Sequence, residues 1–339
     1  MVGIQSINLC LRQFQLEVQM GKVRVFEAFA GYGGASFGLK LSKIDHEVVG
    51  FSEWDKWAIE LFRANHIGVD LYPKENGDIT QIKEGELPDF DLFTGGFPCQ
   101  PFSSAGLGNG ELDIRGSLFY DILRIIKKKT PKHILLENVK GMTHQKHKPT
   151  LEKIVNELKS LGYQVFYEVL NTKNYGVPQN RERLWIYARL NGNLPQGWSI
   201  DPGKTGLNGV RLKNFLDKNP DESLWLSENQ IQRLIEKHRV DMNVPEPLCL
   251  DIYNKKIRHD GISITITEPH HNSLRIVYPP MNGKFRVRKL SMTEHFRLMG
   301  FPDGLIDFAG QSYQQVCKRA GNGWDVNLAS RIFAHILNG

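Results

Sequence analysis

The sequence predicts an α/β protein with a second, smaller domain. Residues 23–28 form an apolar run typical of a buried strand, and a glycine turn and a helical run beginning near Ala35 follow it. Further short apolar runs alternate with amphipathic helical stretches up to about residue 190. From about residue 191, prolines and glycines interrupt every periodic run, which marks a domain boundary.

Composition limits the classes of protein that the chain can represent. Its 339 residues suffice for one large domain and a smaller one. Lys and Arg number 43 and Asp and Glu 37, and the net charge of +6 suits a polyanionic partner, although charge alone favours a solvated mixed-charge surface. The four cysteines are far apart, which favours neither a zinc site nor disulfides and fits a reducing cytoplasm. No apolar run is long enough to span a membrane, and no secretory signal pattern is present.

The first strand leads into a candidate ligand-binding turn. Residues 29–34 read FAGYGG, and a strand, a glycine turn and a helix amino end together form a cradle for a nucleotide-like ligand. Dinucleotide cofactors use similar turns. The next predicted strand, residues 48–51, precedes Glu53, Trp54 and Asp55, which open a helix through Asn65. We expect the acid to bind ribose hydroxyls and the indole to offer a face to adenine, although acids there also favour a helix amino end.

The chain is organised around residues 95–103, which read GGFPCQPFS. They follow an apolar run, residues 91–94, that we expect to be a buried strand. Paired glycines at a strand end allow a sharp turn or a close approach to a ligand, and Pro98 and Pro101 restrict the loop that holds Cys99. A nucleophile in an α/β protein belongs at the carboxyl end of a strand. The alternative is a reduced core cysteine beside Phe97.

The segment after Cys99 predicts a loop and then a helix. Residues 104–116 are rich in glycine and polar residues, so we expect a mobile loop able to close over a substrate, with Arg115 as a candidate phosphate contact. Residues 117–129 then predict an amphipathic helix with Ser117 as its cap. Its apolar face contains Leu118, Phe119, Ile122, Leu123 and Ile126.

Charged residues follow the next predicted strands. Residues 133–136 form a strand that ends at Glu137, and residues 164–170 and 184–188 form two more. Alternation places Arg181 and Arg183 on one face, with Glu182 opposite. Such side chains are commonly a solvated edge, and on spacing alone that interpretation stands beside a functional one.

The remainder of the chain is less periodic. Residues 191–285 contain one helical stretch, residues 228–238, and one strand-like alternation, residues 262–266. Ser291 and Glu294 are spaced as in a capping box that starts a helix. Residues 313–337 predict a helical end that contains Gly321 and Asn322.

The motif around Cys99 resembles the nucleophile motif of the cytosine-5 DNA methyltransferase family of bacterial and phage restriction-modification systems. Further motifs follow in the family's order from Phe29 to the last helix, outside the first twenty residues and the middle of the second domain. The resemblance implies a Rossmann-like doubly wound sheet of the S-adenosylmethionine-dependent methyltransferase type. The chain departs from the family at Glu27, where aspartate is typical, and at Gly323 and Trp324, where Ser or Ala and then Val are typical.

The resemblance implies S-adenosylmethionine as cofactor and S-adenosylhomocysteine as product. Glu53 would contact the ribose, Trp54 would stack on adenine, and Asp78 would contact the adenine amino group, although an Asx turn also explains Asp78. Leu118 matches a cofactor contact but has the spacing of a core residue. The implied cofactor-binding residues are Phe29, Gly31, Gly33, Gly34, Glu53, Trp54, Asp78, Ile79, Pro98, Leu118 and Asn322.

The resemblance also implies a covalent mechanism. The Cys99 thiolate would add to carbon 6 of cytosine, which makes carbon 5 reactive toward the sulfonium methyl group. Glu137 would bind ring nitrogen 3 and the exocyclic amino group, Arg183 would bind the carbonyl oxygen, and Arg181 would lie near the same base. A stacked base cannot present its ring face, so base flipping is required. No metal is needed, because the sulfonium already activates the methyl group.

The implied partner is double-stranded DNA, contacted by Gln100, Ser103, Arg115 and Thr265, where Thr265-Ile266 resembles the recurring dipeptide of the recognition region. We expect residues 1–20 to be an N-terminal extension, with Met20 as a candidate start. Residues 21–190 would form the catalytic and cofactor-binding domain and residues 191–285 the target-recognition domain. Residues 286–339 would form a hinge, in which Arg297 is structural, and a C-terminal helix. We further expect a cytoplasmic monomer and a cognate restriction endonuclease.

Three other interpretations remain open from the sequence. The tRNA-methylating branch of the same family shares the chemistry but typically lacks the Pro-Cys-Gln-Pro form. A dinucleotide-dependent oxidoreductase would use the glycine turn and Glu53 but leaves Cys99, Glu137 and Arg183 without roles. A catalytically inactive DNA-binding relative would explain Trp324 but not the intact catalytic residues.

Overall fold

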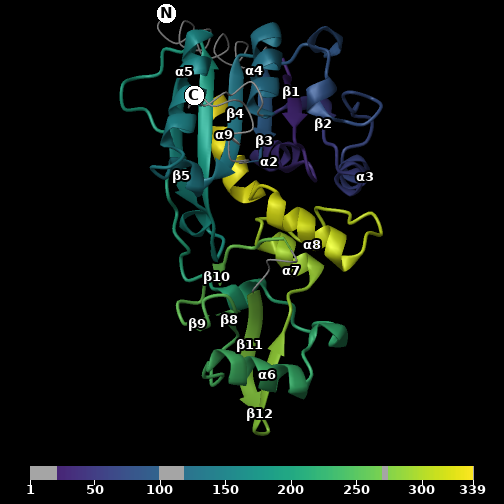
Figure 1. Ribbon diagram of the computed structural model, residues 1–339, viewed down its shortest axis with the longest axis vertical. Coiled ribbons are helices and arrows are strands. Elements are labelled where there is room, and N and C mark those ends of the chain that lie inside the picture. Colours follow the sequence, from purple (N-terminus) through teal and green to yellow (C-terminus); the bar gives the residue numbers. More distant parts are fainter. Residues whose placement is uncertain (1–20, 99–117, 269–273, 339) are drawn as a thin grey trace, which may run out of the picture.

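A six-stranded sheet forms the framework of the upper part of the molecule (Figure 1). The computed structural model describes residues 21–98, 118–268 and 274–338. The strand order is β2-β1-β3-β4-β7-β5, with β7 antiparallel to both of its neighbours and the pairs from β2 to β4 parallel. These strands are β1 (Val23–Ala28), β2 (His46–Ser52), β3 (Leu92–Gly96), β4 (His133–Val139), β5 (Tyr163–Asn171) and β7 (Glu182–Leu190).

The order of the strands reverses at β1. The chain leaves β1 for β2 on one side and later returns to β3 on the other, so the loops after β1 and β3 begin next to each other. In register, Ala28 pairs with Gly95. β3 continues through both glycines of the central motif, further than the predicted strand. Ligands of doubly wound sheets bind in the crevice at such a reversal.

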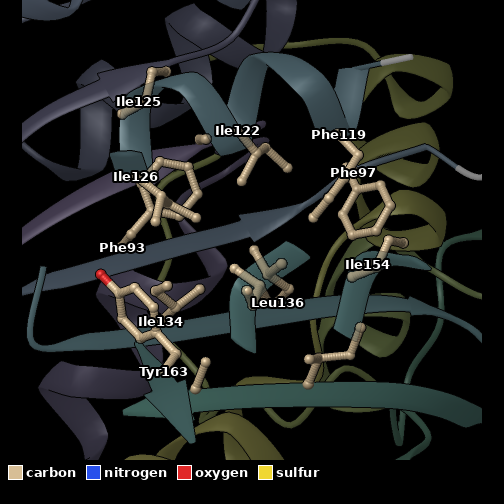
Figure 2. Close-up of a cluster of buried hydrophobic side chains, with 14 of the residues drawn as sticks. Phe93, Phe97, Phe119, Ile122, Ile125, Ile126, Ile134, Leu136, Ile154 and Tyr163 are labelled. Atoms are coloured by element: carbon tan, nitrogen blue, oxygen red, sulfur yellow. The ribbon is translucent and has the colours of Figure 1, made fainter. Parts of the chain in front are cut away.

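Helices cover both faces of this sheet, as a doubly wound fold requires. On one face, α4 (Leu118–Lys129) and α5 (Lys148–Ser160) bury apolar side chains against β3 and β4, as Figure 2 shows. On the other face, α2 (Gly34–Ser42) and α9 (Val326–Leu337) pack against the sheet and each other. α3 (Lys56–Asn65) packs on β2 through Phe51 and Phe62.

A second, four-stranded antiparallel sheet lies at the lower end of the molecule (Figure 1). α6 (Glu228–His238) covers it, and Ile231, Leu248, Val277 and Val287 share its core. The sheet has the order β12-β11-β8-β9 and consists of β8 (Leu248–Asp251), β9 (Lys256–Arg258), β11 (Leu274–Met281) and β12 (Lys284–Arg288).

The helices and strands predicted for residues 191–285 were therefore only partly right. The helix agrees residue for residue with the prediction, but the expectation of only one strand was wrong, because most of a four-stranded sheet also lies here. The alternation at residues 262–266 yields only β10 (Ser263–Ile264), which pairs with β6 (Gln179–Asn180). β11 escaped prediction because Pro279 and Pro280 interrupt its run, a residue type usually kept out of strands.

Two helices connect the sheets. The predicted capping box is confirmed: Ser291 Oγ accepts from the Glu294 backbone N–H at 3.1 Å and begins α7 (Met292–Arg297). Arg297 pairs with Asp217 and Asp303, each at 2.6 Å, which agrees with its predicted structural role. The predicted helical end is α8 (Tyr313–Asn322) and α9, separated by residues 323–325. α7 and α8 lie between the two sheets in Figure 1.

Short 3₁₀ helices occupy several connections of the chain. They are η1 (Ile79–Gln81), η2 (Glu84–Glu86), η4 (Lys140–Thr143), η5 (Thr172–Tyr175), η6 (Leu212–Phe215) and η7 (Glu222–Leu224).

Candidate active site

The glycine turn after β1 adopts a backbone that few residues other than glycine accept. Phe29, Gly31 and Gly33 have φ of 52°, 58° and 90°, in the left-handed region. A Cβ atom added to Gly33 would lie 2.2 Å from Nε2 of the partly buried His66, so a side chain does not fit there. Left-handed backbone at a residue such as Phe29 is uncommon and clusters at ligand sites. The turn leads directly into the amino end of α2.

Glu27 is directed at the start of α2. Its carboxyl group accepts hydrogen bonds from the backbone N–H groups of Ala35 (2.9 Å) and Ser36 (3.1 Å) and from the Ser36 hydroxyl (2.5 Å). Burial raises the pKa of Glu27 to about 7, against the opposing effect of these hydrogen bonds. Both carboxyl oxygens therefore hold the helix that carries the turn.

Glu53 joins the ends of β1 and β2. One carboxyl oxygen accepts from the Gly31 N–H at 3.0 Å and the other from the Asp55 N–H at 2.9 Å. Burial raises the pKa of Glu53. The neighbouring Trp54 is 80 % exposed, which leaves an aromatic face open beside this carboxyl group. Asp55 instead caps α3 by accepting from the Trp57 N–H at 3.0 Å, as the alternative interpretation of this acid proposed.

Three other predicted cofactor residues have structural partners. Asp78 accepts from the Thr80 N–H (3.0 Å) and hydroxyl (2.8 Å), which is the Asx-type turn named as its alternative. Ile79 is buried in the main core, and Leu118 packs against the same core while remaining partly exposed. These contacts explain the three residue types without a ligand, so their cofactor contacts stay predictions.

The central motif is described only up to Pro98. Cys99, Gln100, Ser103 and Arg115 lie outside the described residues, as do the predicted loop and the Ser117 cap. Phe97 is buried against Phe119, and its carbonyl oxygen accepts from the Asn138 side-chain amide at 2.9 Å. Pro98 is exposed. The chain therefore leaves the sheet at a fixed point, immediately after β3.

Glu137 and Arg183 meet at the ends of neighbouring strands. Gly96 pairs with Glu137 across β3 and β4, so the carboxyl group lies beside the start of the central motif. Nε of Arg183 lies 2.9 Å from Oε1 of Glu137, and the two side chains are only 17 % and 10 % exposed. Burial raises the pKa of Glu137, while the positive charges of Arg183 and Arg181 oppose that rise. The two predicted catalytic residues thus form one buried pair.

Arg181 lies close to Glu137, but its guanidinium is held by backbone carbonyl groups. The positive charges of Arg181 and Arg183 both lower the pKa of Glu137, whereas Glu182 pairs with Lys140 at 2.9 Å. The buried guanidinium of Arg181 donates to the carbonyl oxygens of Ile266, Gly321 and Gly323 at 3.1, 3.3 and 2.7 Å. Burial lowers its pKa to about 9. With both Nη groups engaged by backbone, Arg181 is suited to bracing three segments and not to binding a base.

The predicted site residues of the later segments lie near Arg181 and the backbone groups that it contacts. Thr265 donates its hydroxyl to the Asn180 carbonyl oxygen at 2.7 Å. Asn322 donates its side-chain amide to Glu268 at 2.6 Å, so in this structure it contacts the segment after Thr265. The sequence did not assign Trp324 to the site, yet its side chain is buried near Gly34 and Gly96. The only sequence signal that could have pointed to Trp324 was its departure from the family pattern.

A pocket of about 360 Å³ opens beside Thr265. Its lining comes from the β6–β10 pair and from the hairpin formed by β8 and β9. Tyr253, in the turn of this hairpin, is 83 % exposed. Most of the pocket lining is polar or charged: Asn180, Asp251, Tyr253, Asn254, Lys256, Arg258, Ile264, Thr265 and Thr267.

Two further features were sought in the part of the chain that the structure describes. Residues 21–98, 118–268 and 274–338 contain no group of three or more His, Cys, Asp or Glu side chains arranged to hold a metal ion. Within the same ranges, no helix combines the length and apolar character needed to cross a membrane.

Comparisons with known proteins agree with this geometry. The Type II methyltransferase M.HhaI of Haemophilus parahaemolyticus is 33% identical over 325 residues, which cover 94% of this chain and 95% of the relative. M.HaeII of Haemophilus aegyptius is 35% identical over 327 residues, 94% of each chain. The structure of the S. pombe Dnmt2 methyltransferase shares the fold, with a TM-score of 0.72 at 20% identity over 94% of this chain and 99% of that one. A model of the C-5 cytosine-specific DNA methylases matches residues 23–338, and the chain belongs to this family.

Proposed function

We propose that this DNA cytosine-5 methyltransferase acts on a cytosine turned out of duplex DNA, through a transient bond between Cys99 and carbon 6 of the base. The observation that carries the proposal is the buried pair of Glu137 and Arg183 beside the end of β3, from which the chain continues to Cys99 within three residues of Gly96. A flipped base is required because a thiol must approach the face of the pyrimidine ring.

The Glu137–Arg183 pair supplies the two kinds of contact that cytosine needs. Burial raises the pKa of Glu137, and a protonated carboxyl group can donate to ring nitrogen 3 while its other oxygen accepts from the exocyclic amino group. Arg183 uses Nε for Glu137 and Nη1 for the Glu182 carbonyl oxygen, at 2.9 Å each. Among the described residues no group accepts from its Nη2, which suits the carbonyl oxygen of the base, where negative charge develops.

In the proposed reaction, the Cys99 thiolate forms a bond to carbon 6, and the ring electrons move toward carbon 5. Protonation at nitrogen 3 by Glu137 stabilises that electron-rich ring. Carbon 5 would then bond the methyl group as the sulfur–methyl bond of the donor breaks and its electron pair stays on sulfur, which becomes a neutral thioether. Carbon 5 next loses its proton to a base or to water, and nitrogen 3 returns its proton to Glu137. The bond from Cys99 to carbon 6 breaks with return of the electron pair to sulfur, which restores the aromatic ring and the thiolate.

The ends of β1 and β2 fit S-adenosylmethionine as the methyl donor. The left-handed turn at Gly31 and Gly33 gives close backbone access, Glu53 lies where a ribose would meet a carboxyl group, and the open face of Trp54 suits adenine. The donor supplies an electrophilic methyl group on a sulfonium. Glu27 and Asp78 would act indirectly, by fixing the turn and the η1 segment.

Residues 191–285 are proposed as the target-recognition domain, residues 21–190 as the catalytic domain, residues 286–339 as the hinge and last helix, and residues 1–20 as an extension. The second sheet ends at Arg288, which favours a boundary slightly after residue 285. The polar pocket beside Thr265, with Tyr253 and Lys256 at its rim, suits contact with base edges and phosphates. A monomer in the cytoplasm, paired with a cognate restriction endonuclease, would fit this function.

A duplex that contains 5-fluorocytosine at the target position tests the covalent step, because fluorine at carbon 5 cannot leave as a proton does and the adduct persists. With S-adenosylmethionine present, we expect a denaturation-resistant complex of protein and DNA. The Cys99→Ser variant should give none, while a Cys249→Ser variant, whose thiol is buried in the second sheet, should still form it. No adduct with any fluorinated duplex that spans the methylated site would contradict the mechanism, and an adduct only with RNA would favour the tRNA branch.

A further inference from the structure

Arg319 belongs to α8 but reaches the acidic residues that follow β2. Its Nη2 donates to Oδ1 of Asp55 at 2.7 Å and to Oε1 of Gln315 at 3.3 Å. In this α8–α3 ion pair, the side chains of Arg319 and Asp55 are 5 % and 25 % exposed. Lys318 lies further from the same carboxyl group, at 3.6 Å, and is more exposed. Arg319 thus brings a buried positive charge from the last part of the chain to the end of β2.

Asp55 is joined to Glu53 through the backbone. The Asp55 N–H donates to Oε1 of Glu53 at 2.9 Å, while the carboxyl group of Asp55 accepts from the Trp57 N–H at 3.0 Å. Two ionised carboxyl groups this close repel each other. Burial raises the pKa of Glu53 most, and the N–H groups of Asp55 and Gly31 lower it. The two charges then act in opposite directions, because Asp55 raises the pKa of Glu53 and Arg319 lowers it.

The other elements beside Glu53 bring little further charge to it. The glycine turn, residues 29–34, contains no Asp, Glu, Lys, Arg or His, and burial raises the pKa of its Tyr32 well above the usual value. Asp78 is engaged within η1, where its two oxygens accept hydrogen bonds. Lys56 of α3 lies over the ring of the next residue, 4.8 Å from its centroid. The α8–α3 ion pair is therefore the main charged neighbour of Glu53 in the part of the chain that the structure describes.

The charge of Glu53 matters because a ribose presents hydroxyl donors. Each carboxyl oxygen of Glu53 already accepts one backbone N–H, and an ionised carboxylate keeps a second acceptor site on each oxygen. Protonation removes part of that capacity. We infer that Arg319 is a positioning residue that keeps Glu53 ionised for the ribose of the methyl donor by neutralising Asp55. The inference rests on the proposed function, since it takes Glu53 as the ribose contact.

Calorimetric titration of the whole chain with S-adenosylhomocysteine between pH 4.5 and pH 8 tests this inference. Wild-type affinity should fall as the pH drops through the pKa of Glu53, and Glu53→Gln should abolish this dependence. Arg319→Gln leaves the charge of Asp55 uncompensated, so the midpoint of the dependence should rise by about one pH unit. Below that midpoint affinity should fall about 10-fold, whereas at pH 8 it should stay within about 2-fold of wild type. Arg319→Lys should restore most of the wild-type profile.

Asp55→Asn separates charge from structure. Asparagine is a good helix cap and keeps the backbone N–H that Glu53 accepts, but it removes the negative charge. Its midpoint should move to lower pH, opposite to that of Arg319→Gln, and the chain with both substitutions should return close to wild type. Damage to the fold alone would move both single variants in the same direction. Arg297→Gln is the matched control, because it breaks an ion pair with Asp217 at 2.6 Å and should not move the midpoint.

Unmoved midpoints in Arg319→Gln and Asp55→Asn, or shifts of both in one direction, would overturn the inference. Where Arg319→Gln folds poorly, the direction of the Asp55→Asn shift decides the question. A pH dependence that persists in Glu53→Gln would also overturn it, because another group would then control binding. Wild-type protein that binds no S-adenosylhomocysteine at any of these pH values would refute the donor site of the proposed function as well. Normal wild-type binding with unmoved midpoints would refute the role of Arg319 alone.

Discussion

The Nε atom of Arg183 lies 2.9 Å from Oε1 of Glu137, where β7 begins beside the end of the antiparallel strand β4. The arginine uses Nε for this carboxyl group and Nη1 for the carbonyl oxygen of Glu182, and in the proposed mechanism its Nη2 binds the carbonyl oxygen of the base. This division of donors is specific to arginine, because a lysine ammonium is a compact point charge without a fixed fork.

Arg183→Lys should lower the rate of methyl transfer about 10²-fold in single-turnover assays, as loss of an oriented donor commonly does. Affinity for S-adenosylhomocysteine should stay within about 2-fold, since the residue lies away from the β1–β2 end of the crevice. Glu182→Gln is the matched control, because Glu182 pairs with Lys140 and leaves Glu137 untouched. A lysine variant with the wild-type single-turnover rate would contradict the role of the fork.

Trp54→Ala should weaken donor binding about 10-fold, because an indole stacked on adenine contributes both apolar area and stacking. Its side chain is 80 % exposed, so the midpoint of thermal unfolding should hardly change. Trp54→Phe should restore most of the affinity by retaining an aromatic face. Ile67→Ala, at another exposed apolar site, provides the control, and equal affinity in all three variants would rule out stacking at Trp54.

The pair of Arg288 and Glu294, at 2.6 Å and without exposure of either side chain, joins the second sheet to α7. Arg288→Met should reduce stability by about 3–5 kcal/mol, because Glu294 would be left as an uncompensated buried acid. Thermal unfolding followed by circular dichroism measures this loss. Lys284→Met in the same strand breaks an exposed ion pair with Glu228 and should leave the unfolding midpoint unchanged. Similar midpoints of thermal unfolding for the two variants would show that the buried pair does not stabilise the folded chain.

Stability should depend on pH through Glu27. Burial raises its pKa from 4.5 to about 7 in the folded chain, so the folded state binds this proton more tightly than the unfolded state. Glu27 therefore contributes at most about 3 kcal/mol to the free energy of unfolding. This contribution is fully present below about pH 4.5 and is lost as the pH rises through about 7. Urea unfolding should show that the free energy of unfolding falls more between pH 5 and pH 8 for the wild-type chain than for Glu27→Gln. Parallel pH profiles would contradict a raised pKa at this site.

The catalytic half of the fold could be predicted closely from local patterns. β1 begins and ends at the predicted residues because Val25, Phe26 and Ala28 are buried and a glycine turn follows them. The bounds of α6 agree because Ser227 caps the helix and its apolar spacing is regular. The second sheet could not be predicted, because β9 has three residues and β11 contains two prolines. Their pairing depends on partners distant in sequence, which no local window contains.

The sequence likewise predicted some features of the candidate site and not others. Alternation placed Arg181 and Arg183 on one side of the chain, but it could not show that their partners differ. The acceptors of Arg181 lie 85 and 140 residues further along the chain, at Ile266 and Gly321. Trp324 was recognised only as a departure from a pattern, because its meaning depends on two glycines brought to it by folding.

The contact between α2 and α9 joins the first helix of the catalytic sheet to the last helix of the chain. A ribosome therefore makes α2 almost three hundred residues before the helix that packs against it. Until residues 326–337 have been synthesised, the apolar side of α2 lacks its partner, so this face of the catalytic sheet can be buried only in a nearly finished chain.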